Sequence, residues 1–542
     1  NLGYCHRSLG DYKDANDAYE TALSISRESL GENHYKVGQL LNNQGVNLHA
    51  MGDYGAAARA LEQSTAIRDR ARTPAAATGS ARALIDTRFA PQSLLASILA
   101  RTGNSTRAFE VFEQSIGRGI LDDLAVRLRA MPIDLANRRR ELTVRTTELE
   151  RQIESARRKT GPESREILDR LVKEQLATRS ELEGLESELN RTLGPVAGSP
   201  LALARIQERI PKETALVAWL DHHPVGPKAV DPNGEHWVFV LRSAGPPIVV
   251  PVPGSGRDGV WTVDDYETPR RLHSSLRTPN ELFPNESLRR LSTRCVGPLI
   301  PHLAATKDLP AVANLIVLPS SYFRGFPVEL VTPPGIRVSY AASGSLYAHL
   351  RSLPAPKTRG LLAIGDPVIP LASEQEPVAD GGPVAESGGD TGSSPRIAPL
   401  PLTAVEIERI TRVGPTKDDT NLVLLGAEAN KFRLQELTKA DALKKFRYIH
   451  LATHGEIDMD RPARSALVLS PFPISNFAKQ ALQPGVLISD RLTVAEVAEQ
   501  WDLDADLVVL SACETALGRP THGDGYLGFA QALLLAGSRS VV

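Results

Sequence analysis

The sequence predicts a multidomain protein with an all-α N-terminal part, made of helical repeats and a helical hairpin, followed by an α/β domain with a mostly parallel sheet. Three observations support this prediction. A motif recurs at fixed spacing near the N-terminus, a charged segment with regularly spaced leucines follows it, and two apolar runs near the C-terminus each end in a reactive side chain. A chain of 542 residues also exceeds the size at which one hydrophobic core stops growing, so several domains are expected.

The N-terminal repeat is recognised from a spacing of 42 residues. The triplets that begin at Asn1 and Gly10 recur in similar form at Asn43 and Gly52. In each copy one helix ends at Gly-Asp-Tyr and a second follows, with Ala and Leu at helical spacing. A third, degenerate copy is expected over residues 93–116. Stacked helix pairs bury a shared core and leave a concave face for a partner; a plain helical spacer is the alternative.

The residue pattern changes twice in the middle of the chain. Residues 137–193 are highly charged, with leucines at alternating three- and four-residue spacing, and predict a helical hairpin or short coiled coil that acts as a lever or spacer. Beyond Pro195, strands such as 216–220 and 236–241 alternate with Pro- and Gly-rich turns. Residues 372–395 have almost no large apolar side chain, and we expect a disordered insertion, inert rather than a site of activating cleavage.

Composition excludes several classes of function. The 62 basic and 64 acidic residues give a net charge of -2, which offers no reason to expect nucleic-acid or anionic-membrane binding. Three cysteines, Cys5, Cys295 and Cys513, are too scattered for a disulfide framework or a zinc cluster, so a reducing, cytoplasmic compartment is expected. No apolar stretch approaches the roughly 20 residues of a spanning helix, and no secretory signal begins the sequence. Neither a metal nor an organic cofactor is expected.

Two apolar runs near the C-terminus present the candidate catalytic side chains. Residues 448–455 (YIHLATHG) end in His454 and Gly455, and residues 507–514 (LVVLSACE) carry Cys513 near their end. Strands buried on both faces of a parallel sheet lose their polar alternation, and ligand crevices lie outside the carboxyl ends of such strands. We therefore expect His454 and Cys513 side by side at one edge of the sheet.

This pair has the chemistry of an activated thiol nucleophile. The thiol attacks as a thiolate, and an imidazole within reach can take its proton and later protonate the leaving amine. Because Gly beside the His lets the backbone approach the reacting carbonyl, the amides of Gly455 and Cys513 are the expected oxyanion hole. Asp524 and Glu514 are candidate substrate-binding carboxylates for a basic side chain. Asp524, between two glycines, is also typical of an ordinary turn.

With these motifs the sequence resembles the CHAT peptidases, a caspase-like family associated with tetratricopeptide repeats. HLATHG at residues 450–455 is similar to the family's catalytic-His motif, and LVVLSACET at residues 507–515 is similar to its nucleophile motif. Weaker matches lie, in the same order as in the family, at residues 317–319, 326–330, 362–367, 400–403, 523–525, 529–532 and 536–537.

The resemblance implies a caspase-like fold in which His454 and Cys513 form a Cys/His dyad and an inactive half-domain accompanies the catalytic half. The N-terminal repeats resemble tetratricopeptide helix pairs of the longer, kinesin-light-chain-like spacing. The family usually continues through another strand and helix beyond the strand expected at residues 538–542, and the chain begins within a repeat. A fragment of a longer protein is therefore expected.

We predict four parts: tetratricopeptide-like repeats at 1–130, a charged hairpin or coiled-coil linker at 131–195, a pseudo-catalytic half at 196–355 and a catalytic half at 356–542, truncated at its C-terminus. The predicted function is a cysteine endopeptidase that cleaves protein substrates and is regulated or targeted by a protein bound to its repeats. The alternative is a catalytically inactive repeat scaffold or adaptor. An α/β-hydrolase-like esterase is disfavoured because no Gly flanks the Cys at nucleophile-elbow spacing. His450 is expected in a core or hydrogen-bonding role rather than at a metal.

Overall fold

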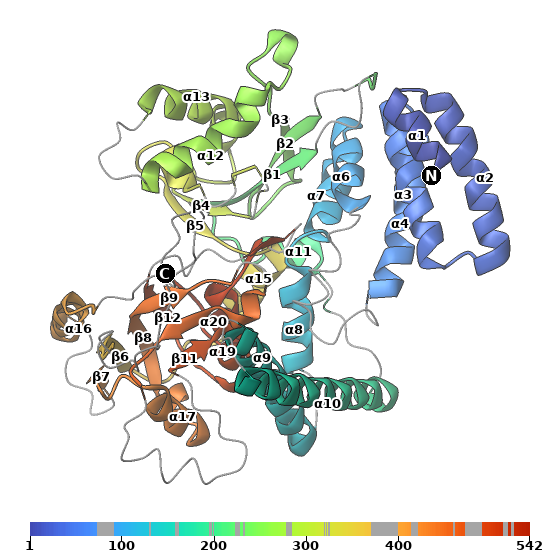
Figure 1. The fold of residues 1–542 in the computed structure, drawn as a ribbon. Helices are drawn as coiled ribbons and strands as arrows, with labels where there is room; N and C mark the ends of the chain where they lie inside the picture. The colour runs from blue at the N-terminus through green and yellow to red at the C-terminus, as the bar shows by residue number, and fades with distance from the viewer. Residues whose placement is uncertain are drawn as a thin grey trace, which may run out of the picture. The chain divides into compact units, whose positions relative to one another are not determined.

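The computed structural model forms two compact units (Figure 1). The first combines Asn1–Ala130, Glu186–Leu353 and Pro520–Gly525, and the second combines Met131–Leu185, Pro354–Arg519 and Tyr526–Val542. The four predicted parts stay a prediction. The structure describes all residues except 73–90, 129–131, 158–161, 194–197, 199, 223–227, 231–233, 278–283, 319, 321, 324–325, 370–398, 414–420, 459–460, 472–489, 513–518 and 522–524. The predicted insertion at 372–395 lies outside the described residues.

Helix pairs form the N-terminal part of the first unit, as the repeated motif predicted (Figure 1). Each pair turns at a glycine in the left-handed region, with φ of 78° at Gly10, 81° at Gly52 and 81° at Gly103, a conformation that other residues rarely adopt. The third pair expected over residues 93–116 is confirmed. The helices are α1 (Leu2–Leu9), α2 (Tyr12–Leu30), α3 (Tyr35–Ala50), α4 (Tyr54–Arg72), α6 (Pro91–Arg101) and α7 (Ser105–Glu113), followed by α8 (Arg118–Leu128).

A five-stranded sheet of order β3-β2-β1-β4-β5 completes the first unit. β1 runs parallel to β4 and β4 parallel to β5, whereas β2 pairs antiparallel with β1 and β3. The strands predicted at 216–220 and 236–241 are confirmed within β1 and β2. The strands are β1 (Thr214–His222), β2 (Glu235–Leu241), β3 (Ile248–Pro251), β4 (Asn314–Val317) and β5 (Arg337–Tyr340), and the helices are α11 (Leu203–Gln207), α12 (Val263–Arg277), α13 (Asn285–Cys295), α14 (Ile300–Leu303) and α15 (Gly344–Ser352).

Strand β1 is buried on both faces, which explains its continuous apolar run. Its even-numbered side chains, Leu216 to Leu220, belong to a core that also contains residues of the repeats. Its odd-numbered side chains, Ala215 to Trp219, belong to a second core with Leu272 of α12 and Leu291 of α13. The alternation follows from the two-residue period of a strand.

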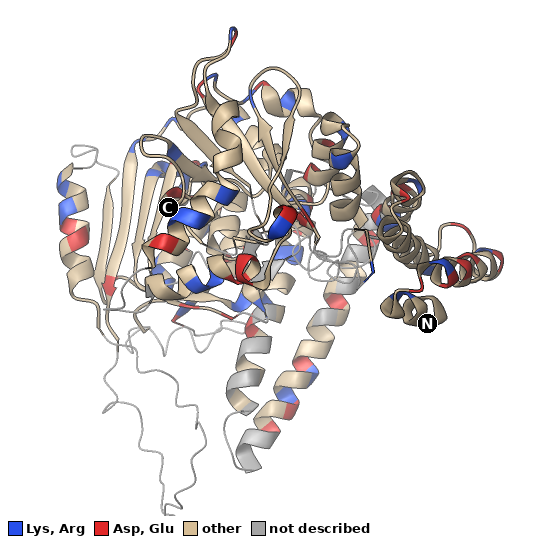
Figure 2. Cartoon of the chain, turned by 90° about the horizontal axis from the view of Figure 1, so that it is seen from above, with Lys and Arg blue, Asp and Glu red and all other residues tan. Residues whose placement is uncertain are grey.

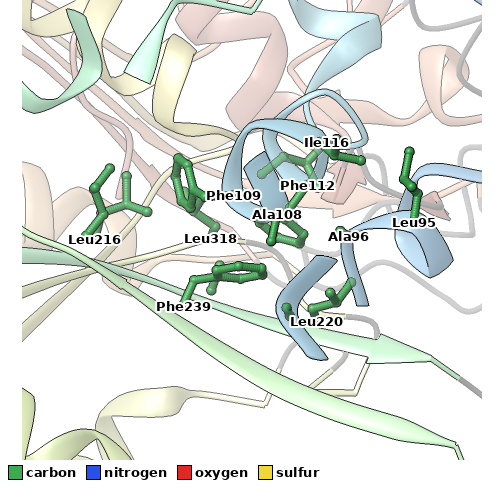
Figure 3. Packing of buried hydrophobic residues seen from close by; sticks show 14 of the residues in the cluster. Leu95, Ala96, Ala108, Phe109, Phe112, Ile116, Leu216, Leu220, Phe239 and Leu318 are labelled. Atoms are coloured by element: carbon green, nitrogen blue, oxygen red, sulfur yellow. The ribbon is translucent and has the colours of Figure 1, made fainter. Parts of the chain in front are cut away.

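Aromatic side chains join the repeats to this sheet (Figure 3). Phe109 and Phe112 of α7 lie against Phe239 of β2, with ring centroids 5.8 and 5.3 Å apart. All three side chains are buried. Because each buried aromatic ring removes a large apolar area from water, the repeats and the sheet share one hydrophobic core.

A buried carboxylate adds a polar contact between the repeats and the sheet. Glu235, at the start of β2, accepts hydrogen bonds from Ser97 and Arg101 of α6 (Arg101 Nε to Oε1, 2.8 Å) and lies 3.0 Å from His49 Nε2 of α3. Its side chain is only 2% exposed. Burial alone would raise the pKa of Glu235, but the hydrogen bonds from His49 and Ser97 and the nearby charges outweigh it and lower the pKa to about 2.

The second unit contains a helical hairpin, formed by α9 (Ile133–Arg157) and the first part of α10 (Pro162–Leu193). Leu149 and Ile153 of α9 pack against Leu171 of α10, so the two predicted helices are confirmed. A coiled-coil geometry stays a prediction. Arg139 of α9 pairs with Glu499 at 3.2 Å, which attaches the hairpin to a helix of the α/β part of this unit.

A four-stranded, all-parallel sheet of order β12-β8-β6-β7 forms the centre of the second unit. Beyond β12, Val542 N–H donates to Val508 O at 2.9 Å and Val541 forms a parallel bridge with Val508, so the strand expected at 538–542 lies beside it. The strands are β6 (Gly360–Pro367), β7 (Leu422–Gly426), β8 (Phe446–Ala452) and β12 (Leu507–Ser511). Helix α16 (Leu402–Val413) packs on one face, and α17 (Lys431–Lys439), α19 (Val494–Gln500) and α20 (Phe529–Ala536) pack on the other.

A small antiparallel sheet of order β11-β10-β9 adjoins the parallel one in sequence and in space. Its strands are β9 (His454–Glu456), β10 (Ala466–Val468) and β11 (Arg491–Thr493). β9 begins two residues after β8 ends, and β11 leads directly into α19. Short strands β13 (Arg519–Thr521) and β14 (Gly525–Leu527) precede α20.

Charged side chains are interspersed in sign over the described residues, and the strands of the parallel sheet are almost free of them (Figure 2). This distribution agrees with a net charge close to zero and a sheet covered on both faces. Within the ranges that the structure describes, the search for a helix of sufficient length and hydrophobicity to cross a bilayer found none.

Candidate active site

The candidate histidine lies at the carboxyl end of strand β8, where the chain passes from the parallel sheet into the small antiparallel sheet. β8 ends at Ala452, and β9 begins at His454. His454 is partly exposed, and its backbone pairs with Val468 of β10. The carboxyl edge of a parallel sheet is where open α/β folds bind ligands. The predicted location of His454 at this edge therefore agrees with the structure.

Thr453 holds the backbone just before the histidine. Its N–H donates to the carbonyl of Ser511 at 3.2 Å, and its hydroxyl donates to the carbonyl of Val468. Its side chain is buried. One residue thus ties the end of β8 both to the end of β12 and to β10, so the backbone entering His454 has little freedom to move. Sequence analysis did not select Thr453, although it lies within the histidine motif.

Strand β12, which precedes Cys513 in the sequence, lies next to β8. The two strands are parallel neighbours, and Tyr448 to Ala452 pair with Leu507 to Ser511. Each pair is offset by 59 positions, and His454 and Cys513 are also separated by 59 positions in the sequence. Cys513, Glu514 and Asp524 themselves lie outside the described residues.

Gly455 and Glu456 follow the histidine in β9. Gly455 pairs with Leu467, and Glu456 pairs with Ala466. The carboxylate of Glu456 makes two contacts with the guanidinium of Arg491 in β11, at 2.8 Å (Nε) and 2.7 Å (Nη2). Such a two-pronged ion pair fixes geometry as well as charge. Neither residue was selected from the sequence, because three-residue strands carry no recognisable alternation.

A buried ion pair anchors strand β11. Lys431 Nζ lies 2.6 Å from Glu496 Oε1 and donates to the carbonyl of Arg491 at 3.1 Å. Glu496 also accepts the N–H of Thr493 at 2.9 Å, completing a capping box at the start of α19. The lysine and glutamate side chains are 9% and 8% exposed. β11 is thereby fastened to the helix that follows it.

His450, four residues before His454, points to a different part of the sheet. Its Nε2 lies 2.9 Å from Glu406 Oε1 of α16, so the expected hydrogen-bonding role is confirmed. Burial lowers the pKa of His450 although Glu406 opposes the effect. A cavity of about 620 Å³ adjoins His450 on this face, lined mainly by apolar side chains of α16, β8 and β12. Its lining lies in the first half and middle of the strands and not at their carboxyl edge.

The first unit has a closed polar network where β1 ends. Asp221 lies 3.0 Å from His236 Nδ1, His236 Nε2 lies 3.0 Å from the Tyr266 hydroxyl, and Ser320 donates to Asp221 at 3.1 Å. Cys295 is fully buried, and burial raises the pKa of its thiol to about 12. A thiol with that pKa stays neutral and is a poor nucleophile. Cys5, in contrast, is exposed on α1.

Two family models match the chain. The CHAT domain model matches residues 285–542, and a tetratricopeptide repeat model matches residues 1–70. A crystal structure of nearly identical tetratricopeptide-like repeats of a kinesin light chain from Podosopora anserina is aligned over 35% of this chain and 93% of its own, at 19% identity and a TM-score of 0.18. The search of curated proteins gave no match.

The two domain matches fall on the parts of the fold described above. The repeat match covers the first two helix pairs, and the CHAT match covers the whole parallel sheet with both apolar runs. CHAT domains form a caspase-like peptidase family. The protein therefore carries a CHAT domain of the caspase-like peptidases at residues 285–542 and tetratricopeptide repeats at its N-terminus.

Proposed function

We propose that the protein is a cysteine endopeptidase in which Cys513 is the nucleophile and His454 is its general base. The observation that supports this most strongly is the common offset of 59 positions in the β8–β12 pairing and between these two residues. The hydrogen bond from Thr453 N–H to Ser511 O extends the pairing of β8 with β12 by one residue past Ala452, the last residue of β8. Neighbouring parallel strands of equal register bring their following residues to the same edge.

The proposed reaction needs no cofactor. The Cys513 thiolate attacks the carbonyl carbon of the scissile peptide bond, forming a C–S bond and an oxyanion, which the amides of Gly455 and Cys513 stabilise. When the tetrahedral intermediate collapses, the C–N bond breaks and the His454 imidazolium protonates the leaving amine. Water then hydrolyses the thioester, with His454 taking the proton of the water, and the thiol is regenerated.

The substrate-binding residues that we propose are Asp524 and Glu514. Both lie close to Cys513 in the sequence. A carboxylate beside the nucleophile would pair with a lysine or arginine side chain of the substrate, and a partly desolvated pair of this kind is strong. The proposed substrates are therefore proteins with a basic residue before the cleaved bond.

The repeats are proposed to bind a protein regulator or substrate. Tetratricopeptide repeats mediate protein–protein interactions, and stacked helix pairs of this kind offer a concave face to a partner. A cytoplasmic location is proposed from the few, widely scattered cysteines of the sequence. Binding of the partner would deliver substrate to the site or order the segment that carries Cys513.

Selective thiol labelling tests this function. We expect iodoacetamide at pH 6 to alkylate Cys513 at least about tenfold faster than exposed Cys5. At this pH a thiol paired with histidine is ionised, whereas an ordinary thiol with a pKa of about 8.5 is not. Cys295 should remain unlabelled, since it is buried. Peptide mapping by mass spectrometry gives the rate at each cysteine.

The variant His454→Ala provides the control. Its Cys513 should react no faster than Cys5 at pH 6, while Cys5 itself keeps its rate. If Cys513 and Cys5 react equally in the unaltered protein, with and without a repeat-binding partner, the thiol is not activated. The protein would then be a repeat scaffold or adaptor with an inactive caspase-like module.

A further inference from the structure

Strand β9, which begins with His454, is short and lies at the edge of its sheet. It has three residues, and among the described strands it pairs only with β10. Short edge strands have few backbone hydrogen bonds and are easily displaced. Thr453 fixes the backbone that enters His454, so the restraint still needed is one on the far side of the histidine, within β9.

The ion pair between Glu456 and Arg491 supplies that restraint. His454 and Glu456 are two residues apart and share one face of the strand. His454 pairs with Val468 and Val468 with Arg491, so His454 and Arg491 stand in one row across the sheet and on the same face. From that row Arg491 reaches past β10 to Glu456, so the outer strand is tied directly to β11.

Arg491 is itself held from two sides. Its guanidinium also contacts Asp490 at 2.7 Å, and its carbonyl accepts a hydrogen bond from buried Lys431. Lys431 is paired with Glu496, whose helix α19 packs into the core through Val497. The Arg491 side chain is 19% exposed, and two carboxylates already neutralise its charge. This arrangement is suited to holding geometry rather than to binding an anionic ligand.

We propose that Arg491 is a positioning residue for His454: through Glu456 it holds β9 so that the imidazole stays within hydrogen-bond reach of the nucleophile. The proposal deepens the proposed peptidase function and rests on it. A displacement of about 1 Å at a reacting group is enough to reduce the rate about a hundredfold. In this role the effect of Arg491 passes through Glu456.

The test combines Arg491→Gln with a charge exchange. In Arg491→Gln we expect kcat for peptide cleavage to fall 10- to 100-fold with KM unchanged. The pH midpoint of Cys513 alkylation should move up toward the ordinary thiol value of about 8.5, because the thiolate loses its imidazolium partner. The double variant Arg491→Glu with Glu456→Arg should recover at least part of both losses. Arg433→Gln, which removes an exposed ion pair on α17, is the matched control and should change neither.

Two results would overturn the positioning role. One is an Arg491→Gln protein with the pH midpoint and kcat of the unaltered protein. The other is a loss accompanied by a lower melting temperature that the charge exchange does not repair, which would mean a purely structural contact. Failure of the peptidase function is distinct from both, because Cys513 would then titrate as an ordinary thiol even in the unaltered protein.

Discussion

We expect the replacement of Cys513 by Ala to abolish peptide cleavage, with kcat falling on the order of a million-fold, while the fold is retained. The size of the effect follows from covalent catalysis, since without the sulfur no acyl-enzyme forms and only binding and the oxyanion hole remain. In the sequence, Cys513 lies two positions after Ser511, the last residue of β12. The measurement is cleavage of a peptide library with basic residues, with the melting temperature followed in parallel.

Two further variants make this result specific. Cys5→Ala removes an exposed thiol on α1 and should leave kcat unchanged. His454→Ala should lose nearly as much activity as Cys513→Ala, and the double variant little more, because the two residues act as a unit. A Cys513→Ala protein that still cleaves the library would exclude Cys513 as the nucleophile.

We expect the free energy of unfolding of the first unit to fall by about 3 kcal/mol between pH 6 and pH 2 because of Glu235 alone. The pKa of this carboxyl is lowered from an ordinary 4.5 to about 2 in the folded protein. A lowered folded-state pKa contributes stability above the unfolded-state value, and that contribution is lost as pH falls through the folded-state value. Each pKa unit corresponds to about 1.4 kcal/mol, and the side chain is almost fully buried, so little is lost to solvent screening.

Urea unfolding at a series of pH values measures this contribution. Trp237, whose Nε1 lies 3.3 Å from Glu235, reports unfolding at the junction by fluorescence. Glu235→Gln should be less stable than the unaltered protein at pH 7, and the difference should shrink as pH falls from about 5 to 2. Glu208→Gln, which removes half of an exposed pair with Arg205, is the control and should keep the full pH dependence. Parallel pH profiles for Glu235→Gln and the unaltered protein would contradict the prediction.

The parts of the fold that sequence analysis predicted are those with a local signature. The turns at Gly10 and Gly52 recur because the same helix pair is built twice, and β8 and β12 are recognisable because strands covered on both faces have mostly apolar side chains. The packing of Phe109 on Phe239 has no such signature. It joins residues 130 positions apart whose own helix and strand patterns carry no information about each other.

The candidate site shows the same division. His454 was found because it ends an apolar run in a recognisable motif. Arg491 and Glu456 were missed because each is one charged residue in a short strand, where charged residues are most often simply solvated. The positioning role proposed for them depends on the register of three strands, which is set by tertiary packing and not by local propensity.

The hydrophobic core shared by the repeats and the sheet limits which parts of this protein can be expressed separately. Phe109 and Phe112 of α7 cover the face of the sheet that carries Leu216, Leu220 and Phe239. A CHAT region expressed without the repeats would leave that face open to water, and an apolar surface of this kind favours association with other copies and precipitation. For the same reason, transplanting the repeats of another protein onto this sheet would require matched aromatic residues and a counterpart for Glu235. The repeats are thus an integral part of the first unit and cannot simply be exchanged for those of another protein.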